Sequence, residues 1–482
     1  MKYHLVTLGC QMNKSDSERV RTVVEGMGYR WTDDETAADL LGVLACSVRQ
    51  KSIDKVYSRI HKWNSWKDRR NLITFVSGCI LPADREKFLK QFDLIFEMNE
   101  LRMFPEMLSQ YGILTPVSYM RNMDLAENNE PENGQPDFSD IKLLPEKSKE
   151  EILRPLLREP EQRIRDFWQL TPTYNSSFEA FIPIQNGCDK FCTFCAVPYT
   201  RGREISRPSH EILNELAALV NKGYKSITLL GQNVNSYGKD RHGNEISFTE
   251  LLKKIGEFGK ESGKDFWVYF TSPHPRDMTG EVIEVISQFS CLAKQIHLPL
   301  QSGDDKVLIK MNRKHSTEDY RKVVNHIRKV LPEATLFTDI IVGFTGETDE
   351  QFENTRRSME EFRFNMAYIA KYSPRPGAAS SRWADDVPIE VKNERLHKLT
   401  HELTKYTFTY NKELRGKKLK VLVTGKDRKE GYLSALTEGK LVLRFKSDDT
   451  SLTGKYAEVK VESATAFALE AVYSKRLIEE EV

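Results

Sequence analysis

The first 115 residues alternate short apolar runs with longer polar segments. The apolar runs lie at 3–9, 39–45 and 71–78, and polar segments of helical length lie at 15–28 and 50–63. Buried strands joined by helical crossovers are typical of a parallel sheet with helices on its faces. We therefore expect residues 1–115 to form a doubly wound parallel α/β domain.

The same order of strand and helix recurs six times between residues 175 and 407. The expected strands lie at 178–185, 226–231, 266–272, 295–301, 336–344 and 366–373. Six successive β/α units predict a partial (β/α)6 barrel with its active site at the carboxyl ends of the strands. Polar or glycine-rich residues follow each expected strand, as Asn186-Gly187 does after the first, and their backbone groups suit ligand binding. Loops are polar in most proteins, so this feature supports the prediction without deciding it.

Residues 408–475 carry short strands at close spacing, which predicts a small antiparallel β-barrel of the OB-like kind. Between residues 410 and 460 there are 13 Lys and Arg against seven Asp and Glu. Aromatic residues interleave with these bases at Tyr410, Tyr432, Phe445 and Tyr456. Small barrels with basic and aromatic surfaces bind nucleic acid, and a barrel with a purely structural role is the alternative.

The segment between the first two regions, residues 116–174, has a different composition. Residues 122–140 hold six acidic residues and no basic one, together with Asn, Pro and Gly. Such a stretch cannot bury enough apolar surface to fold, so we expect a solvated, charged linker.

Composition describes an ordinary globular protein. The 482 residues suffice for about three domains. No run reaches the roughly 18 consecutive apolar residues of a membrane-spanning helix, and no secretory signal is visible at the amino terminus. The expected location is the cytoplasm, where reducing conditions disfavour structural disulfides. The seven cysteines therefore require metal binding or reactivity as an explanation.

Three cysteines follow the three expected strands of the first region. Cys10, Cys46 and Cys79 are spaced 36 and 33 residues apart. The carboxyl ends of parallel strands lie at one edge of an open sheet, where ligands bind. The three thiols can therefore converge on one point, although isolated cysteines are also common as small core residues.

Three further cysteines lie close together after the first expected strand of the central region. Cys188, Cys192 and Cys195 form a C-x3-C-x2-C pattern. Zinc sites prefer four ligands, and the nearest histidine is His210. Three thiolates are what a cubane iron–sulfur cluster needs if one iron is to keep an open position.

The spacing of this loop, with Phe194 directly before the third cysteine, resembles the radical S-adenosylmethionine (SAM) superfamily. The resemblance implies that the open iron binds SAM and that its reductive cleavage yields a 5′-deoxyadenosyl radical. It also implies that Phe194 lies near the adenine of SAM. The other implied SAM contacts are Gly231, Gln232, Asn233, Ser272, Gln301, Asp339, Gly343 and Glu347. Each of these is also a plausible turn residue.

The combination of both cysteine groups with a terminal β-barrel resembles the methylthiotransferase family over nearly the whole chain. This resemblance implies that Cys10, Cys46 and Cys79 hold a second, auxiliary 4Fe-4S cluster, from which sulfur is delivered. It further implies that the terminal barrel is a TRAM domain, which binds RNA. The implied cofactors are two 4Fe-4S clusters and SAM.

Several stretches are similar to the tRNA-modifying MiaB branch of that family. They are "LGCQMNKSDSE", "CSVRQKS", "CAVPYTRGREISRP" and "LLGQNVNSYG". The chain departs from the usual pattern at Leu44-Ala45, where Asn-Thr often stands, and at Thr345, where proline is common. The implied reaction is methylthiolation of carbon 2 of isopentenyladenosine beside the tRNA anticodon, at position 37. The alternatives are threonylcarbamoyl-adenosine in tRNA, a ribosomal protein side chain, and a non-catalytic zinc-stabilised RNA-binding protein.

The same resemblance implies several partners. They are the anticodon stem-loop of tRNA, an electron donor such as flavodoxin or ferredoxin, and a sulfur source, with no membrane. Arg201, Arg203 and Arg207 follow the cysteine loop and are candidates for phosphate contacts. The seventh cysteine, Cys291, precedes a buried strand, and we expect it in the core.

Overall fold

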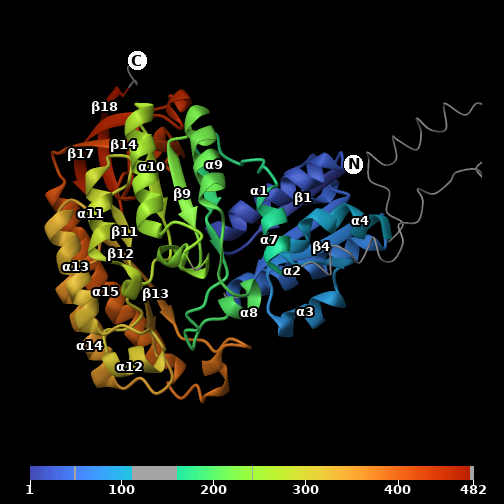
Figure 1. Ribbon diagram of the computed structural model, residues 1–482, viewed down its shortest axis with the longest axis horizontal. Coiled ribbons are helices and arrows are strands. Elements are labelled where there is room, and N and C mark those ends of the chain that lie inside the picture. Colours follow the sequence, from blue (N-terminus) through green and yellow to red (C-terminus); the bar gives the residue numbers. More distant parts are fainter. Residues whose placement is uncertain (48–49, 111–159, 242, 478–482) are drawn as a thin grey trace, which may run out of the picture. The chain divides into compact units, whose positions relative to one another are not determined.

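The computed structural model describes residues 1–47, 50–110, 160–241 and 243–477 (Figure 1). The chain divides into two compact units, Met1–Asn175 and Ser176–Val482. Most of the expected acidic linker, residues 116–159, lies outside the described residues. None of the helices in the described ranges is long and apolar enough to cross a membrane.

The first unit is built on a five-stranded sheet in the order β2-β1-β3-β4-β5. The strands are β1 Lys2–Thr7, β2 Arg30–Trp31, β3 Leu40–Cys46, β4 Ile73–Cys79 and β5 Leu94–Ile95. All neighbouring strands are parallel. The prediction of a parallel α/β domain is thus confirmed. The two edge strands have two residues each, too few to produce a recognisable pattern in the sequence.

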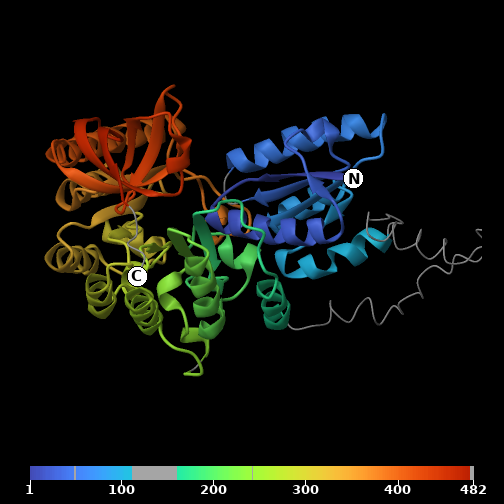
Figure 2. The ribbon, with the colours of Figure 1, turned by 90° about the horizontal axis from the view of Figure 1, so that it is seen from above.

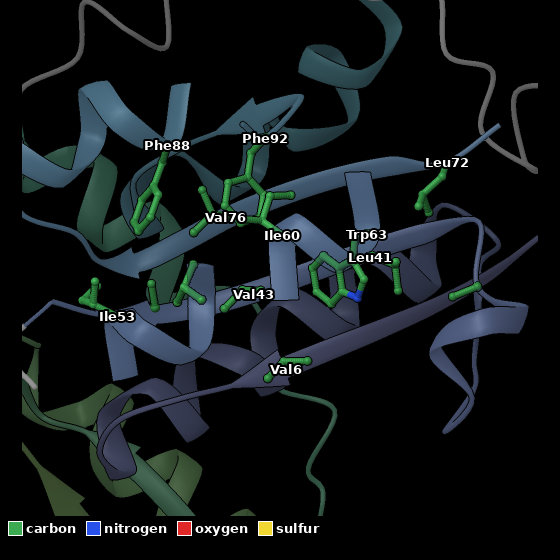
Figure 3. Close-up of a cluster of buried hydrophobic side chains, with 13 residues drawn as sticks. Val6, Leu41, Val43, Ile53, Ile60, Trp63, Leu72, Val76, Phe88 and Phe92 are labelled. Carbon is green, nitrogen blue, oxygen red and sulfur yellow. The ribbon is translucent and has the colours of Figure 1, made fainter. Parts of the chain in front are cut away.

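Helices cover this sheet and bury its apolar side chains. The helices are α1 Gln11–Gly26, α2 Gln50–Lys67, α3 Pro82–Leu89, α4 Phe104–Gln110 and α7 Pro160–Trp168. Figure 3 shows one core cluster, in which Trp63 and Ile60 of α2 lie against Val43 of β3 and Val76 of β4. All four are fully buried, and burial of this kind stabilises by about 1.5–3 kcal/mol per large side chain.

Part of the segment expected as linker belongs to this first unit. Helix α7 buries Ile164, Phe167 and Trp168. The backbone amide of Thr173 then donates to the carbonyl oxygen of Glu18 in α1 (3.1 Å). Residues 160–175 are therefore packed structure, because their apolar face outweighs their high charge.

The second unit begins with six parallel strands. They are β6 Glu179–Pro183, β9 Ser226–Leu230, β10 Trp267–Phe270, β11 Gln295–His297, β12 Thr335–Val342 and β13 Met366–Lys371. They form two three-stranded sheets, β10-β9-β6 and β11-β12-β13. A parallel bridge between Val268 and Leu292 connects β10 to the residues just before β11. The strands thus follow one another in chain order, and the predicted partial (β/α)6 barrel is confirmed.

Helices connect the strands of this barrel on the outside. The crossover helices are α9 Ser209–Asn221, α10 Phe248–Ser262, α11 Gly280–Gln288, α13 Thr317–Val330 and α14 Asp349–Phe362. Most are capped at the N-terminus by a side chain, such as Ser316 of α13 and Thr348 of α14, each in a capping box. Two short elements, β7 Gln185–Asn186 and β8 Ile205–Ser206, form a hairpin around the loop that contains the second cysteine group.

A closed five-stranded barrel ends the chain (Figure 2, red). Its strands are β14 Lys418–Lys426, β15 Tyr432–Thr437, β16 Val442–Lys446, β17 Tyr456–Ala464 and β18 Leu469–Arg476. All pairs are antiparallel except β16 with β18. The sequence pattern predicts short strands at 419–425, 431–437, 440–446 and 455–463, which match β14 to β17, but it does not predict β18. The expected boundary at residue 408 falls inside helix α15, Ile389–Glu413.

A turn of the C-terminal barrel fits against the amino-terminal side of the larger barrel. The hydroxyl of Tyr269 donates to the carbonyl oxygen of Glu438 (3.0 Å), and that of Thr335 donates to Gly439 (2.8 Å). Beside this turn, Trp267 and Tyr456 pack edge to face with ring centroids 4.7 Å apart. The C-terminal barrel is therefore attached at the opposite end from the carboxyl ends of the strands.

Candidate active site

The loop triad, Cys188, Cys192 and Cys195, lies between β7 and helix α8, Val197–Arg201. Its backbone folds back on itself, because the Cys195 amide donates to the Cys192 carbonyl oxygen (3.0 Å). Gly187 has a φ of +78°, and a Cβ atom added there would lie 1.9 Å from the carbonyl oxygen of Arg203. Only glycine fits at this position, so the loop depends on the glycine directly before its first cysteine.

The thiols of the loop triad are strongly desolvated. Burial, reinforced by the neighbouring cysteines, raises the pKa of Cys188 to about 11 and that of Cys195 to about 12. Thiols with pKa values this high need a cationic group to become thiolates. Within the described ranges, no three His, Cys, Asp or Glu side chains are close enough to hold a single metal ion. Zinc sites prefer four ligands, whereas a donor set of three cysteines fits an iron–sulfur cluster with one open iron.

A buried arginine lies against the loop triad. Arg313 is 6% exposed, and its guanidinium donates to Cys192 Sγ (3.5 Å) and to the Pro299 carbonyl oxygen (3.1 Å). No carboxylate of the described residues forms an ion pair with it, and its Nε has no hydrogen-bond partner among them. A buried cation without an anion is unstable, so this position calls for an anionic group beside the cysteines. The sequence did not predict Arg313 as a site residue, because no motif in the neighbouring sequence indicates that it contacts a cysteine.

Phe194 packs against a buried apolar cluster. Its ring packs against the buried cluster of Val307, Met311, Phe344 and Tyr372, at 6.5 Å and edge to face with Phe344. These residues come from three different strand-end segments. The side chain named from the resemblance as the adenine neighbour thus lies in an aromatic setting next to the cysteines.

The end of β9 carries buried polar atoms that lack partners. Asn233 is 1% exposed, and neither its Oδ1 nor its Nδ2 has a hydrogen-bond partner among the described residues. Gln232 Oε1 and Gln185 Oε1 are also buried without a hydrogen-bond partner among the described residues. A Cβ atom added at Gly231 would lie 2.9 Å from Gln185 Oε1. Buried amides are nearly always hydrogen-bonded, so this cluster points to a bound polar ligand.

Two other predicted contacts have unusual backbone conformations. Ser272 after β10 has a φ of +59° and Gln301 after β11 has a φ of +71°. The Gln301 amide donates to the Asp339 carbonyl oxygen (2.8 Å), which holds it at the sheet edge. Left-handed conformations in residues other than glycine cost energy and gather at binding sites.

Asp339, Gly343 and Glu347 lie on and after β12. Asp339 Oδ2 is 2.7 Å from Nε2 of His297, and both side chains are partly exposed. Glu347 is buried, and its Oε2 accepts from the Gly343 amide (2.6 Å) and from Arg395 (2.8 Å). Burial raises the pKa of Glu347 to about 7. Glu347 thus shapes the turn after β12, and only its Oε1 lacks a partner among the described residues.

The N-terminal triad, Cys10, Cys46 and Cys79, meets at one edge of the first unit's sheet. Cys46 and Cys79 end β3 and β4 and are directly paired in register. Cys10 precedes α1, and a Cβ atom added at Gly9 (φ +110°) would lie 2.6 Å from Cys46 Cβ. The three strand ends therefore bring the three cysteines together, as the topology predicts.

The three arginines after the loop triad have different surroundings. Arg203 is 73% exposed and pairs with Asp189 (3.0 Å), while Arg201 is half-buried at the end of α8. Arg207 is buried and ion-paired with Glu211 and Glu215. The prediction of a phosphate contact by Arg207 is therefore wrong, because its buried guanidinium is already paired with two carboxylates.

The aromatic residues predicted to stack on RNA in the C-terminal barrel differ in their exposure. Phe445 is in the barrel core and Tyr456 packs on Trp267, so neither is available for stacking. Tyr432 is half-exposed, with Lys429 Nζ 3.8 Å and the Arg444 guanidinium 5.8 Å from its ring. One aromatic between two cations remains a candidate for RNA contact. Elsewhere, Cys291 is 5% exposed and lies in the core, as predicted.

A three-cysteine loop at the carboxyl end of the first strand of a partial (β/α)6 barrel defines the radical SAM class of enzymes. In agreement, the Radical SAM superfamily matches residues 182–359. An uncharacterized protein family, UPF0004, matches residues 2–97, and the TRAM domain matches residues 412–473.

The chain belongs to the MiaB-type methylthiotransferase family. It is 36% identical to the tRNA-2-methylthio-N(6)-dimethylallyladenosine synthase of Thermoanaerobacter pseudethanolicus, over 97% of this chain and 92% of that protein. It is also 36% identical to the synthase of the same name from Oceanobacillus iheyensis, over 99% of this chain and 85% of that protein.

Among solved structures, the chain is similar to the radical SAM methyltransferase TsrM from Kitasatospora setae. The match has a TM-score of 0.45 and 13% identity, and it covers 79% of this chain and 75% of that one. This likeness is too low to bear on the activity.

Proposed function

We propose that the chain is a radical SAM tRNA methylthiotransferase, which adds a methylthio group to carbon 2 of isopentenyladenosine at position 37, next to the anticodon. The observation that carries the proposal is the presence of two separate cysteine triads, each assembled at the carboxyl ends of parallel strands. An aromatic C–H bond is not acidic, so it is not broken by general acid–base catalysis at ordinary pKa values. A radical initiator and a sulfur source must therefore act on one substrate, and two triads meet that need.

The loop triad would hold the 4Fe-4S cluster of the radical SAM reaction. When bound, this cluster and SAM supply a 5′-deoxyadenosyl radical. The protein's own part is to bind SAM and exclude water. Phe194 and its apolar neighbours offer a surface for the adenine, and Arg313 offers a buried positive charge for an anionic group. The further proposed SAM contacts are Gly231, Gln232, Asn233, Ser272, Gln301, Asp339, Gly343 and Glu347.

The N-terminal triad would hold a second 4Fe-4S cluster, from which the sulfur is delivered. Cys46 and Cys79 are buried and Cys10 is exposed. A site with two buried ligands and one exposed ligand is held firmly by the sheet while staying accessible on one side. This arrangement suits a cluster that must exchange a group with the substrate.

The C-terminal barrel and the segment after the loop triad would bind the tRNA. Arg201 and Arg203 are the remaining candidates for phosphate contacts, and Tyr432 between Lys429 and Arg444 is a candidate for base stacking. A one-electron donor such as flavodoxin or ferredoxin and a separate sulfur source would complete the reaction. We place this reaction in the cytoplasm, because the substrate is tRNA.

Nucleoside analysis of tRNA tests the proposal directly. Cells that lack the gene should accumulate isopentenyladenosine, and the wild-type gene should restore its 2-methylthio derivative. Genes with Cys188/Cys192/Cys195→Ala or Cys10/Cys46/Cys79→Ala should not restore it. Restoration of a threonylcarbamoyl-adenosine derivative instead, or an unchanged tRNA profile with a modified ribosomal protein, would assign one of the alternative substrates.

Measurements on the purified proteins test the two triads independently. After anaerobic reconstitution, wild type should contain roughly eight irons per chain and each triple variant roughly four. Of the two triple variants, only Cys10/Cys46/Cys79→Ala should still cleave SAM. Zinc in place of iron would contradict the radical mechanism.

A further inference from the structure

A buried asparagine contacts the three chain segments that carry the N-terminal triad. Asn13 is the third residue of α1 and is 0% exposed. Its Nδ2 donates to the Leu8 carbonyl oxygen (2.7 Å) and to the Ala45 carbonyl oxygen (2.8 Å). Its Oδ1 accepts from Cys79 Sγ (3.6 Å).

These contacts link the cysteines through the backbone. Leu8 lies two residues before Cys10, and Ala45 lies directly before Cys46. The third contact is made by a cysteine itself. The three strand ends are far apart in the sequence, so no local turn can set their separation. The register of the sheet places the strand ends side by side, and the Asn13 amide links all three of them.

The orientation of this amide is determined by its partners. Both hydrogens of Nδ2 face carbonyl oxygens, and turning the amide over would place Oδ1 against those two oxygens. The hydrogen bond from Cys79 requires a protonated thiol, whereas a cluster ligand is a thiolate. On ligation the proton of Cys79 leaves, and the contacts with the two carbonyl groups are the ones that persist.

We infer that Asn13 is the positioning residue of the N-terminal triad, and that it holds the cysteines at cluster-binding separation before any cluster is inserted. The inference rests on the proposed function, because it assumes that this triad binds a cluster. Nothing in the spacing of the cysteines reveals this role. It follows from the three contacts made by one side chain.

The test uses the Cys188/Cys192/Cys195→Ala protein, in which only the N-terminal triad can bind iron. Asn13→Asp has the same shape but cannot donate to the two carbonyl groups, and it places a negative charge beside the thiolates. Asn13→Ala removes the donors without adding charge. Iron, sulfide and the EPR spectrum of the reduced protein are measured after anaerobic reconstitution. Both variants should retain less than about half of the roughly four irons of the parent.

The matched control is Asn64→Asp. Asn64 is also in the first unit and donates from Nδ2 to a carbonyl oxygen, that of Gln91 (3.1 Å), but it lies on α2 and its hydrogen bond joins no cysteine segment. This control should keep its full iron. A circular dichroism melt of each protein separates loss of the cluster from loss of the fold. Equal iron loss in the control, or iron loss that only follows unfolding, would overturn the inference.

Two outcomes distinguish this inference from the proposed function. If Cys10/Cys46/Cys79→Ala in the same background keeps its iron, the second cluster does not exist and both ideas fail. If that change removes the iron while both Asn13 variants keep full iron and an unchanged EPR spectrum, only the role of Asn13 is wrong.

Discussion

The two cysteine triads reach similar chemistry by different routes. The loop triad spans eight positions of one loop, and the backbone of Cys195 is hydrogen-bonded to that of Cys192 within this loop. The N-terminal triad joins three strand ends, and its geometry depends on the register of a parallel sheet. A local triad can be recognised by its spacing alone, whereas a dispersed triad exists only when the surrounding domain is folded.

The two triads also differ in their electrostatic surroundings. The loop triad lies against a buried guanidinium, and the N-terminal triad lies against a neutral amide. A positive charge in a poorly solvated site stabilises added negative charge far more than an amide does. We therefore expect the loop triad to be the one that accepts an electron more readily.

Glycine substitutions should break each triad separately, and they carry the largest expected effect. Gly187→Ala should abolish iron binding by the loop triad, because its φ is +78° and the new Cβ would overlap the Arg203 carbonyl group. Gly9→Ala should do the same to the N-terminal triad, where φ is +110° and Cys46 is in the way. Either conformation alone costs about 1–2 kcal/mol for a residue with a side chain. Iron analysis and SAM cleavage of the two variants measure the effect.

The control for both is Gly26→Ala, since an added Cβ atom there meets nothing within 4 Å. It should keep both clusters. If Gly9→Ala also removed the iron of the loop triad, the two sites would not be independent, and the comparison would fail.

The sequence could predict the loop triad and the main strands for one physical reason. Their signals are local, as in the C-x3-C-x2-C spacing or the run from residue 336 to 344. The convergence of Cys10, Cys46 and Cys79 was predictable from topology, because parallel strands share one carboxyl edge.

The positions of Arg313, Asn13 and Arg207 were not predictable. Arg313 reaches Cys192 across 121 residues of chain, and Asn13 reaches Ala45 across 32. Arg207 was predicted to contact phosphate, but Glu211 and Glu215 in the first two turns of α9 form ion pairs with it. Strand β18 was missed because three of its eight residues are charged.

Neutralising Arg313 should sharpen the electrostatic contrast. Arg313→Gln keeps a donor for Cys192 but removes the charge, and Arg313→Lys keeps the charge with a different shape. We expect SAM cleavage to fall at least about tenfold with glutamine, which corresponds to about 1.4 kcal/mol, and to fall less with lysine. Asn13 variants should leave SAM cleavage unchanged. Rates of 5′-deoxyadenosine formation with a chemical reductant measure this, and equal rates for glutamine and wild type would contradict the role of the charge.

RNA affinity should be independent of both triads. Tyr432→Ala should weaken binding of the anticodon stem-loop about fivefold or more, because stacking of one base on an aromatic ring contributes about 1–3 kcal/mol. Tyr432→Phe keeps the ring and should bind like wild type. The two triple cysteine variants should also bind like wild type. A fluorescence titration at two salt concentrations gives the affinities, and an unchanged affinity for Tyr432→Ala would remove this residue from the RNA surface.

The last expected effect is a pH dependence of stability that arises near the loop triad. His274 is buried, and its pKa is lowered to about 2, first by burial and then by the charge of Arg313. A group whose pKa is depressed in the folded state stabilises the protein above its ordinary pKa, here 6.5, and this stability is lost as the pH falls. The free energy of unfolding should therefore lose up to about 1.4 kcal/mol per pH unit below that value from this residue.

His274→Asn isolates this contribution. His274 Nδ1 accepts from the Arg276 amide (3.2 Å), and asparagine can keep that hydrogen bond without titrating. The stability difference between wild type and His274→Asn, measured by urea unfolding, should shrink as the pH falls from 7.5 to about 5. The same difference measured for Asn13→Ala should stay constant, because an amide does not titrate. A constant difference for His274→Asn would mean that this histidine is solvated or already charged in the folded protein, and the contrast between a charged and a neutral setting would then rest on Arg313 alone.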